Sequence, residues 1–135
     1  MKILITGGNT AVHIDKVRVI TNIFKGKTAC DIAADALESN HYVVLVGNPH
    51  MQDYFHEHCP AIPDKFICYK TYDELYSIMG KEITSGTYDA VIHSAAVSDY
   101  KVGGVIADNA VLDNNKKISS LKPESQPTLT CGGAR

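Results

Sequence analysis

Three short segments of the sequence carry groups that suit the binding of a phosphate or a nucleotide. The first is Thr6-Gly7-Gly8-Asn9-Thr10, which directly follows an apolar run. Paired glycines such as Gly7 and Gly8 let the backbone approach a phosphate closely, and the Thr10 hydroxyl can donate a hydrogen bond. A plain tight exit from a strand would use the same residues, and the spacing lacks the GxGxxG pattern of dinucleotide-binding turns. Position and composition together favour contact with a ligand.

The second segment combines a cation, an amide and the start of a helix. Arg18 offers a bidentate fork for phosphate or carboxylate, and Asn22 offers both a donor and an acceptor for a polar intermediate. Gly26 precedes an expected helix whose N-terminal amides favour an anion. The GKT that begins there looks like the end of a P-loop, but Thr21 stands where that motif needs its first glycine. The P-loop interpretation therefore fails, and an exposed arginine with a helix-capping asparagine is the alternative to a ligand site.

The third segment runs from His93 to Tyr100, with the sequence HSAAVSDY. Its small residues leave room for a ring or a sugar, and Asp99 can accept hydrogen bonds from a base or a ribose. Close packing of small residues, with Asp99 capping a turn, is the alternative interpretation.

Other residues of chemical interest are better explained by solvation or packing. His50, His56, His58 and Cys59 are all types that ligate metals, but their spacing fits no familiar zinc pattern. We interpret them as the solvated face of a helix. Cys30 is expected to be a small core residue, and the stripe of Tyr72, Tyr76 and Met79 is also expected to lie in the core.

The elements that position these segments alternate between strand and helix. Apolar runs predict strands at 2–6, 42–46, 65–69 and 89–93, and residues recurring at steps of three and four predict helices at 26–40 and 72–85, with a short helix within 50–59. Strands this apolar are buried on both faces, so we expect a three-layer α/β fold with a Rossmann-like, doubly wound parallel sheet. Ligands of such sheets bind beyond the carboxyl ends of the strands, where residues 7–22, 47–50 and 93–100 fall.

The regular pattern is lost after Tyr100. Residues 101–115 are expected to form an excursion or arm, and residues 116–120 to start another strand. Residues 121–135 carry Pro123, Pro127, Gly132 and Gly133 without periodicity, and we expect an irregular tail there. The expected organisation is a nucleotide-binding domain at 1–120 followed by this tail.

Composition excludes several classes of protein. The chain has 135 residues, 44% of them hydrophobic, which suits one globular domain. A net charge of -2 provides no basic field for nucleic acid or an anionic membrane. No apolar run approaches the roughly 20 residues of a membrane span, and the first glycine comes too early for a secretory signal. Four cysteines without a CxxC pair are expected to be reduced, so we expect a cytoplasmic protein.

An NAD(P)-binding dehydrogenase or epimerase is one candidate, because the VIHSAA stretch at 91–96 is similar to the end of strand four in short-chain dehydrogenases and sugar-nucleotide epimerases. Three features oppose it. The first turn lacks the third glycine of the dinucleotide fingerprint, and the second strand ends in Gly47-Asn48 without an acidic residue for a ribose. No tyrosine has a lysine four residues later, so the Tyr/Lys pair of that superfamily is missing.

A more specific resemblance rests on five motifs in a fixed order: ITGGNT, IDKVRVITN, a GK that opens a helix, VIHSAAVSDY and KKISS. Over residues 1–120 the chain resembles the phosphopantothenate–cysteine ligase family of coenzyme A biosynthesis. The resemblance implies a ligase that joins 4′-phosphopantothenate to cysteine. CTP or ATP activates the carboxylate as an acyl-nucleotide, and Mg²⁺ accompanies the triphosphate.

The resemblance also implies roles for individual residues. Asn22 matches the asparagine that holds the acyl-nucleotide, and Arg18 matches the arginine before it, so both are expected to bind substrate. Lys117 matches the lysine of the first half-reaction, and we expect Asn22 and Lys117 to be catalytic. The expected nucleotide-binding residues are Gly7, Gly8, Gly26, His93, Ser94, Ala95, Asp99 and Lys117.

The chain also departs from the family pattern. The sequence at 24–29 is FKGKTA, where the family has Ser-Ser-Gly-Lys-Met-Gly, and the family continues for roughly another hundred residues after the position of Ser120. We therefore expect an N-terminal portion of the ligase, and a non-catalytic nucleotide-binding remnant is the main alternative. The resemblance further implies that residues 101–120 form an arm that pairs across a homodimer.

Overall fold

The computed structural model describes residues 1–85, 87–107, 110–112, 115, 117 and 126–131. They belong to two compact units, which we describe separately. The first unit contains residues 1–10 and 22–97, and the second contains residues 11–21 and 98–135.

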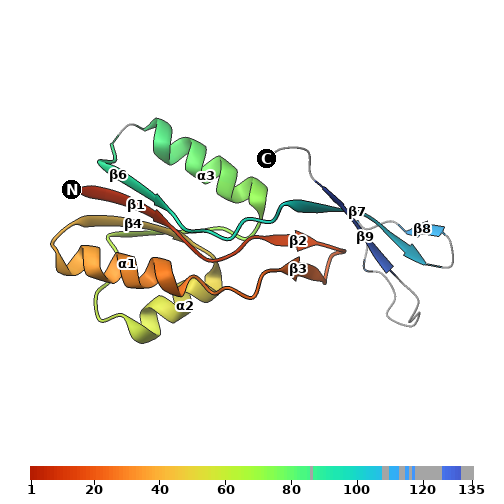
Figure 1. Ribbon diagram of the computed structural model, residues 1–135, viewed down its shortest axis with the longest axis horizontal. Helices are drawn as coiled ribbons and strands as arrows, with labels where there is room; N and C mark the ends of the chain where they lie inside the picture. The colour runs from red at the N-terminus through yellow and green to blue at the C-terminus, as the bar shows by residue number, and fades with distance from the viewer. Residues whose placement is uncertain (86, 108–109, 113–114, 116, 118–125, 132–135) are drawn as a thin grey trace. The chain divides into compact units, whose positions relative to one another are not determined.

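The first unit is built on a four-stranded parallel sheet with the order β5-β4-β1-β6 (Figure 1). Its strands are β1 (Lys2–Thr6), β4 (Tyr42–Gly47), β5 (Lys65–Cys68) and β6 (Ala90–His93). All four predicted strands are therefore confirmed to within one residue at each end. The chain moves outward from β1 through β4 to β5 and then returns to the other side of β1, so the switch in direction lies between β1 and β6.

Helices cover both faces of this sheet. Figure 1 shows α1 (Lys27–Glu38) and α2 (Pro49–His58) on one face and α3 (Tyr72–Thr84) on the other. Alternate residues of the central strands fill the two core layers, with Ile3 and Ile5 toward α1 and α2, and Leu4 toward α3. Cys30 is fully buried among the first group, as predicted. The three-layer, doubly wound α/β fold is confirmed.

The helices start in three different ways. Gly26 precedes α1 with a φ of 82°, in the left-handed region, and no side chain caps that helix. Asn48 caps α2 by accepting a hydrogen bond from the Met51 amide, with Pro49 as the first helical residue. Thr71 caps α3 in a capping box with Glu74.

The prediction that the stripe of Tyr72, Tyr76 and Met79 lies in the core is confirmed for Met79 and wrong for Tyr76. The side of α3 that packs on the sheet carries Leu75, Ile78 and Met79, whereas Tyr76 is 70% exposed and only stacks on Tyr72. Successive residues of a helix are about 100° apart, so a face centred on Leu75 turns Tyr76 toward solvent. The sequence pattern was broader than the face that the sheet covers.

The secondary-structure elements described in the second unit are all strands. Strands β2 (Ala11–His13) and β3 (Val19–Thr21) form an antiparallel hairpin, and β8 (Ala110–Leu112), β7 (Tyr100–Ala107) and β9 (Gln126–Cys131) form an antiparallel sheet in that order. The prediction of an irregular tail is wrong for residues 126–131. Pro127 is tolerated there because β9 is an edge strand, where a missing amide hydrogen costs little.

The predicted division into a domain at 1–120 and a tail at 121–135 stays a prediction, and the two compact units of the structure follow other boundaries, with residues 11–21 grouped with residues 98–135. Of the strand predicted at 116–120, only Lys117 lies within the described residues, and it is exposed and outside any strand. Within the described part of the chain, no helix combines the length and the apolar character needed to cross a membrane.

Candidate functional site

The loops that follow β1 and β6 run side by side at the carboxyl edge of the sheet. The Ala96 amide donates to the Gly8 carbonyl oxygen at 2.8 Å, and the Thr10 amide donates to the Ala96 carbonyl oxygen at 3.2 Å. These bonds extend the parallel pairing of the two strands beyond their ends, with a bridge between Asn9 and Ala96. Parts of the predicted segments 7–22 and 93–100 therefore lie side by side at the topological switch point of the sheet, where ligands of such sheets bind.

The glycines of the first turn are required by close packing. A Cβ atom on Gly7 would lie 2.3 Å from the Cβ of Ala29, so only glycine lets α1 approach the end of β1 this closely. Gly8 has a φ of 82°, and a Cβ on Gly26 would lie 2.6 Å from the Gly8 amide nitrogen. The start of α1 is therefore held directly against the Gly8 turn. Since no side chain caps α1 and its first turn has no acidic residue, its first amides suit an anion.

Hydrogen bonds among three asparagines, Asn48, Asn9 and Asn22, connect the loops around this edge of the sheet. The Asn48 side-chain oxygen accepts from the Met51 amide at 2.8 Å, and its nitrogen donates to the side-chain oxygen of Asn9. The Asn9 nitrogen donates in turn to the backbone carbonyl oxygen of Asn22. Because each amide is used as both donor and acceptor, both side-chain orientations are determined by their partners. The network ties the loop that holds Asn22 to the end of β1.

Asn22, the residue expected to bind the acyl-nucleotide, is exposed at this edge. Within the described residues its side-chain amide makes no hydrogen bond, so only its backbone is used in the network. Asn9 and Asn48 are the site residues that sequence reasoning missed. An asparagine directly before a proline after a buried strand is a helix-capping signal, and it could have identified Asn48.

His93 and Ser94 are held by the last residue of β1. Thr6 is fully buried, and its hydroxyl oxygen lies 2.7 Å from the His93 Nδ1 atom. The Ser94 amide donates to the Thr6 carbonyl oxygen at 3.0 Å and reaches the hydroxyl oxygen at 3.2 Å. Ala95, the next predicted residue, packs against the core layer beneath α3. The predicted residues His93 and Ser94 are therefore positioned by Thr6 of β1, and Ala95 by packing against the core.

The buried side chain of Tyr69 holds the glycine turn that follows β1. Its side chain is 1% exposed, and its hydroxyl donates to the Gly7 carbonyl oxygen at 2.8 Å. Burial raises the pKa of the Tyr69 hydroxyl, so it stays protonated and remains a donor. A buried hydrogen bond thus holds the Gly7 carbonyl group of the turn in place.

The remaining predicted residues belong to the second unit and are described within it. Asp15 is buried and accepts hydrogen bonds from the Val17 and Arg18 amides, while its other oxygen accepts from Arg18 Nε at 3.0 Å and Nη2 at 2.6 Å. The guanidinium fork of Arg18 is thus oriented by Asp15. Asp99 and Lys117 are exposed.

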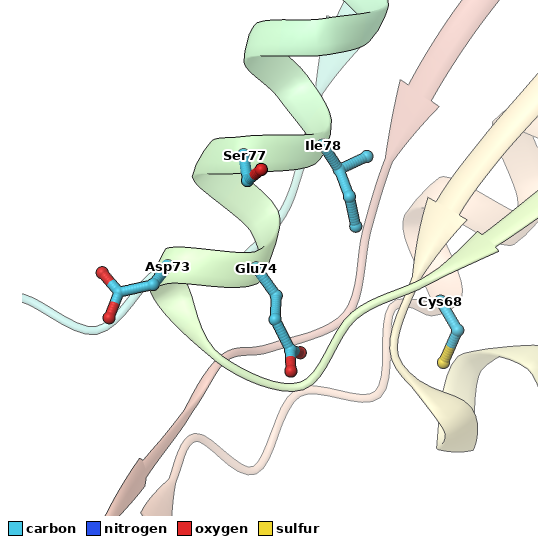
Figure 2. A pocket seen from close by; sticks show the side chains of 5 residues that line it. All are labelled: Cys68, Asp73, Glu74, Ser77 and Ile78. Atoms are coloured by element: carbon cyan, nitrogen blue, oxygen red, sulfur yellow. The ribbon is translucent and has the colours of Figure 1, made fainter.

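Two of the hollows that the described residues line lie beside helices of the first unit, and neither of these two includes a predicted site residue. Figure 2 shows the first, of about 380 Å³, between the end of β5 and the start of α3. Its Glu74 side chain points to the loop before α3, where it accepts from the Lys70 amide. Its Cys68 thiol has a pKa raised by burial, which disfavours the reactive thiolate.

The second hollow, of about 200 Å³, is lined by Lys25 and four residues of α2, namely His50, Asp53, Tyr54 and Glu57. The histidines of α2 are solvent-exposed, and His58 stacks on Tyr54 with its Nδ1 atom 3.0 Å from the Tyr54 carbonyl oxygen. Among the described residues, no group of three or more His, Cys, Asp and Glu side chains could hold a metal ion.

Comparison with known proteins agrees with this fold. A family model for the DNA/pantothenate metabolism flavoprotein C-terminal domain matches residues 1–126. The coenzyme A biosynthesis bifunctional protein CoaBC of Thermococcus kodakarensis is 29% identical over 122 residues, which are 90% of this chain and 28% of that protein.

Solved structures show the same likeness. The DNA/pantothenate metabolism flavoprotein from Streptococcus pneumoniae matches with a TM-score of 0.75 at 26% identity, over 98% of this chain and 60% of that one. The C-terminal domain of CoaBC matches with a TM-score of 0.59 at 25% identity, over 87% of this chain and 54% of that one. A Cab2 mutant in complex with phosphopantothenate-cysteine shares the fold, with a TM-score of 0.60 at 16% identity.

The chain thus spans 28% of the curated relative and 60% and 54% of the first two solved chains. The family match covers all five motifs on which the resemblance to phosphopantothenate–cysteine ligases was based, and it decides against the dehydrogenase alternative. The chain belongs to the family of the DNA/pantothenate metabolism flavoprotein C-terminal domain.

Proposed function

We propose that this chain carries the nucleotide-binding part of a phosphopantothenate–cysteine ligase of coenzyme A biosynthesis. The observation that carries the proposal is the paired loops after β1 and β6, which meet the uncapped start of α1 at the switch point of the sheet. In a member of this family, that edge is where a nucleoside triphosphate would bind. CTP or ATP is the proposed co-substrate, with Mg²⁺ held mainly by the phosphates.

The proposed reaction has two steps. The carboxylate of 4′-phosphopantothenate attacks the α-phosphorus, which forms an acyl-nucleotide and releases pyrophosphate. The amine of cysteine then attacks the acyl carbon, which forms an amide and releases the nucleoside monophosphate. Asn22 would hydrogen-bond the acyl-nucleotide through its unengaged amide, and the positive charge of Lys117 would offset charge that develops on the phosphates.

We expect this 135-residue chain to bind nucleotide weakly and to ligate little. It spans 60% of the solved flavoprotein chain from Streptococcus pneumoniae, so contacts made by the rest of such a chain are not supplied by these residues. Each charge-assisted contact to a phosphate is worth roughly 1.5–3 kcal/mol. Two missing contacts would therefore lower affinity by about 10²-fold or more.

Calorimetry with Mg-CTP and Mg-ATP tests the site. Lys117→Ala and Asp99→Ala should each bind more weakly than the wild type, and equal affinities in all three proteins would place the nucleotide elsewhere. A coupled assay for nucleoside monophosphate tests the turnover. Robust release that depends on both phosphopantothenate and cysteine would contradict the expected weakness, whereas binding without release would favour a non-catalytic nucleotide-binding protein.

The proposed homodimer through residues 101–120 is tested separately by light scattering. Strand β7 has both of its edges paired within the chain, with β8 and β9, so a partner strand would have to add to one of these outer strands. A clean monomer at high concentration would exclude the dimer.

A further inference from the structure

The buried hydroxyl of Thr6 contacts the exposed side chain of His93 where the neighbouring strands β1 and β6 end. Thr6 and His93 are register partners on β1 and β6, so their side chains point to the same face of the sheet. That face is the one covered by α3, because Leu4 and Val44 pack there with Leu75. The cover does not reach the outer part of β6, where Val91 is 45% exposed.

The hydrogen-bonding capacity of Thr6 determines which nitrogen of His93 carries a proton. A threonine hydroxyl donates once and accepts twice, and a buried hydroxyl hydrogen needs an acceptor. Within the described residues the Thr6 hydroxyl has two neighbours, the Ser94 amide, which can only donate, and His93 Nδ1. The hydroxyl must therefore donate to Nδ1, which leaves the neutral imidazole with its hydrogen on Nε2.

The second nitrogen of the ring faces away from Thr6. In the described part of the chain, His93 Nε2 has no hydrogen-bond partner. A donor of known tautomer is thus presented at the carboxyl edge of β6, directly before the loop of Ser94 to Ala96 that pairs with Gly8. A preset donor costs less to use than one that must be oriented on binding.

We propose that Thr6 is a positioning residue that fixes His93 as an Nε2–H donor, and that this donor binds an acceptor oxygen of the nucleotide. The inference rests on the nucleotide site proposed above. The acceptor oxygen belongs either to the phosphates or to the nucleoside, and the two sources are separated by titrating tripolyphosphate and cytidine individually.

The tautomer is measured first, on the free protein, by long-range ¹H–¹⁵N correlation spectra of the histidine rings at a pH where they are neutral. His93 should show a protonated Nε2 and an unprotonated Nδ1. Thr6→Val should give averaged shifts for the two nitrogens, and Thr6→Ser should restore the wild-type pattern. A proton on Nδ1 in the wild type, or no change in Thr6→Val, would overturn the assignment.

Nucleotide affinity is then compared in two matched variants. The side-chain nitrogen of His93→Gln reaches the position of Nε2 and can still donate to the ligand, while His93→Asn ends at the position of Nδ1 and can only serve Thr6. We expect His93→Gln to bind Mg-CTP within a few-fold of the wild type and His93→Asn to bind about tenfold more weakly. The opposite ranking, or equal affinities, would mean that His93 serves only to satisfy Thr6.

The two failures are distinguishable. If the wild-type chain binds no nucleotide, the proposed function and the ligand contact of His93 are both refuted, while the ring spectra still decide the role of Thr6. The nucleotide could instead bind without a shift of the Nε2–H signal by the nucleotide, by tripolyphosphate or by cytidine. In that case only the ligand contact of His93 is refuted.

Discussion

The asparagine network predicts that Asn48 contributes more to stability than an ordinary helix cap does. Asn48 is 4% exposed, caps α2 through its oxygen and holds Asn9 through its nitrogen. In Asn48→Ala, loss of the cap costs about 1 kcal/mol, and the unpaired Asn9 oxygen costs about 1–3 kcal/mol more. We expect the free energy of unfolding to fall by about 2–4 kcal/mol in total.

Thr71→Ala is the matched control, because Thr71 also caps a helix of the first unit but belongs to an exposed capping box. It should cost about 1 kcal/mol. Asn48→Asp separates the two roles of Asn48. Its carboxylate keeps the cap but offers no donor to Asn9, so its stability should lie between those of the wild type and Asn48→Ala.

Urea unfolding followed by helical circular dichroism measures all three variants, since α1, α2 and α3 all belong to the first unit. The slopes should be equal, so that shifts in midpoint report stability. If Asn48→Ala costs no more than Thr71→Ala, and Asn48→Asp is as stable as the wild type, the network contributes nothing and the reasoning is refuted.

Three further predictions concern packing, acid stability and thiol reactivity. Gly7→Ala should destabilise the fold by about 1–3 kcal/mol because its Cβ would meet Ala29 at 2.3 Å, whereas Gly80→Ala, with nothing within 4 Å, should be neutral or stabilising by up to about 1 kcal/mol in urea unfolding. Hydrogen bonds from Tyr88 and Lys65 hold the pKa of Glu82 below its usual 4.5. Its contribution is therefore present above that value and lost as pH falls through the lower folded pKa, so Glu82→Gln should be less stable than wild type near neutral pH, and the difference should shrink as pH falls below 4.5. Burial raises the pKa of the Cys30 thiol to about 12, so thiol titration should show Cys68 reacting in the folded protein and Cys30 only after unfolding. A fast thiol that disappears in Cys30→Ser would contradict this.

The fold of the first unit was predictable because its signals are local and strong. Residues 2–6 and 42–46 are continuous apolar runs that end in glycine, and each helix between the strands has its own apolar face. The direction of the strands then follows from the right-handed crossover rule, so only the face of α3 was assigned too broadly.

The second unit was less predictable, because its strands are short or carry contrary signals. Residues 11–13 and 19–21 have three residues each, too few for an alternating pattern, and their turn is closed by Asp15 and Arg18 rather than by an Asn-Gly pair. Pro127 indicated an irregular tail, although an edge strand accommodates it.

The candidate site was predictable in position but only partly in detail. The carboxyl ends of the predicted strands indicated which loops meet. The glycine turn and His93 both lie at the carboxyl edge of the sheet. The contact of Asn9 with Asn48 joins residues 39 positions apart, and the packing of Gly7 depends on a helix that begins after a separate hairpin. Contacts of this kind are created by the tertiary fold, so no local pattern indicates them.

The central claim is that a nucleoside triphosphate binds at the carboxyl edge of β1 and β6. Titration of Mg-CTP and Mg-ATP into the ¹⁵N-labelled chain tests it most directly, by the movement of assigned backbone amide signals. The account predicts saturable shifts at Gly8, Asn22 and Ala95, with no shift at Gly80 on the solvent-facing part of α3. Shifts confined to other regions, or none with either nucleotide at millimolar concentration, would contradict it.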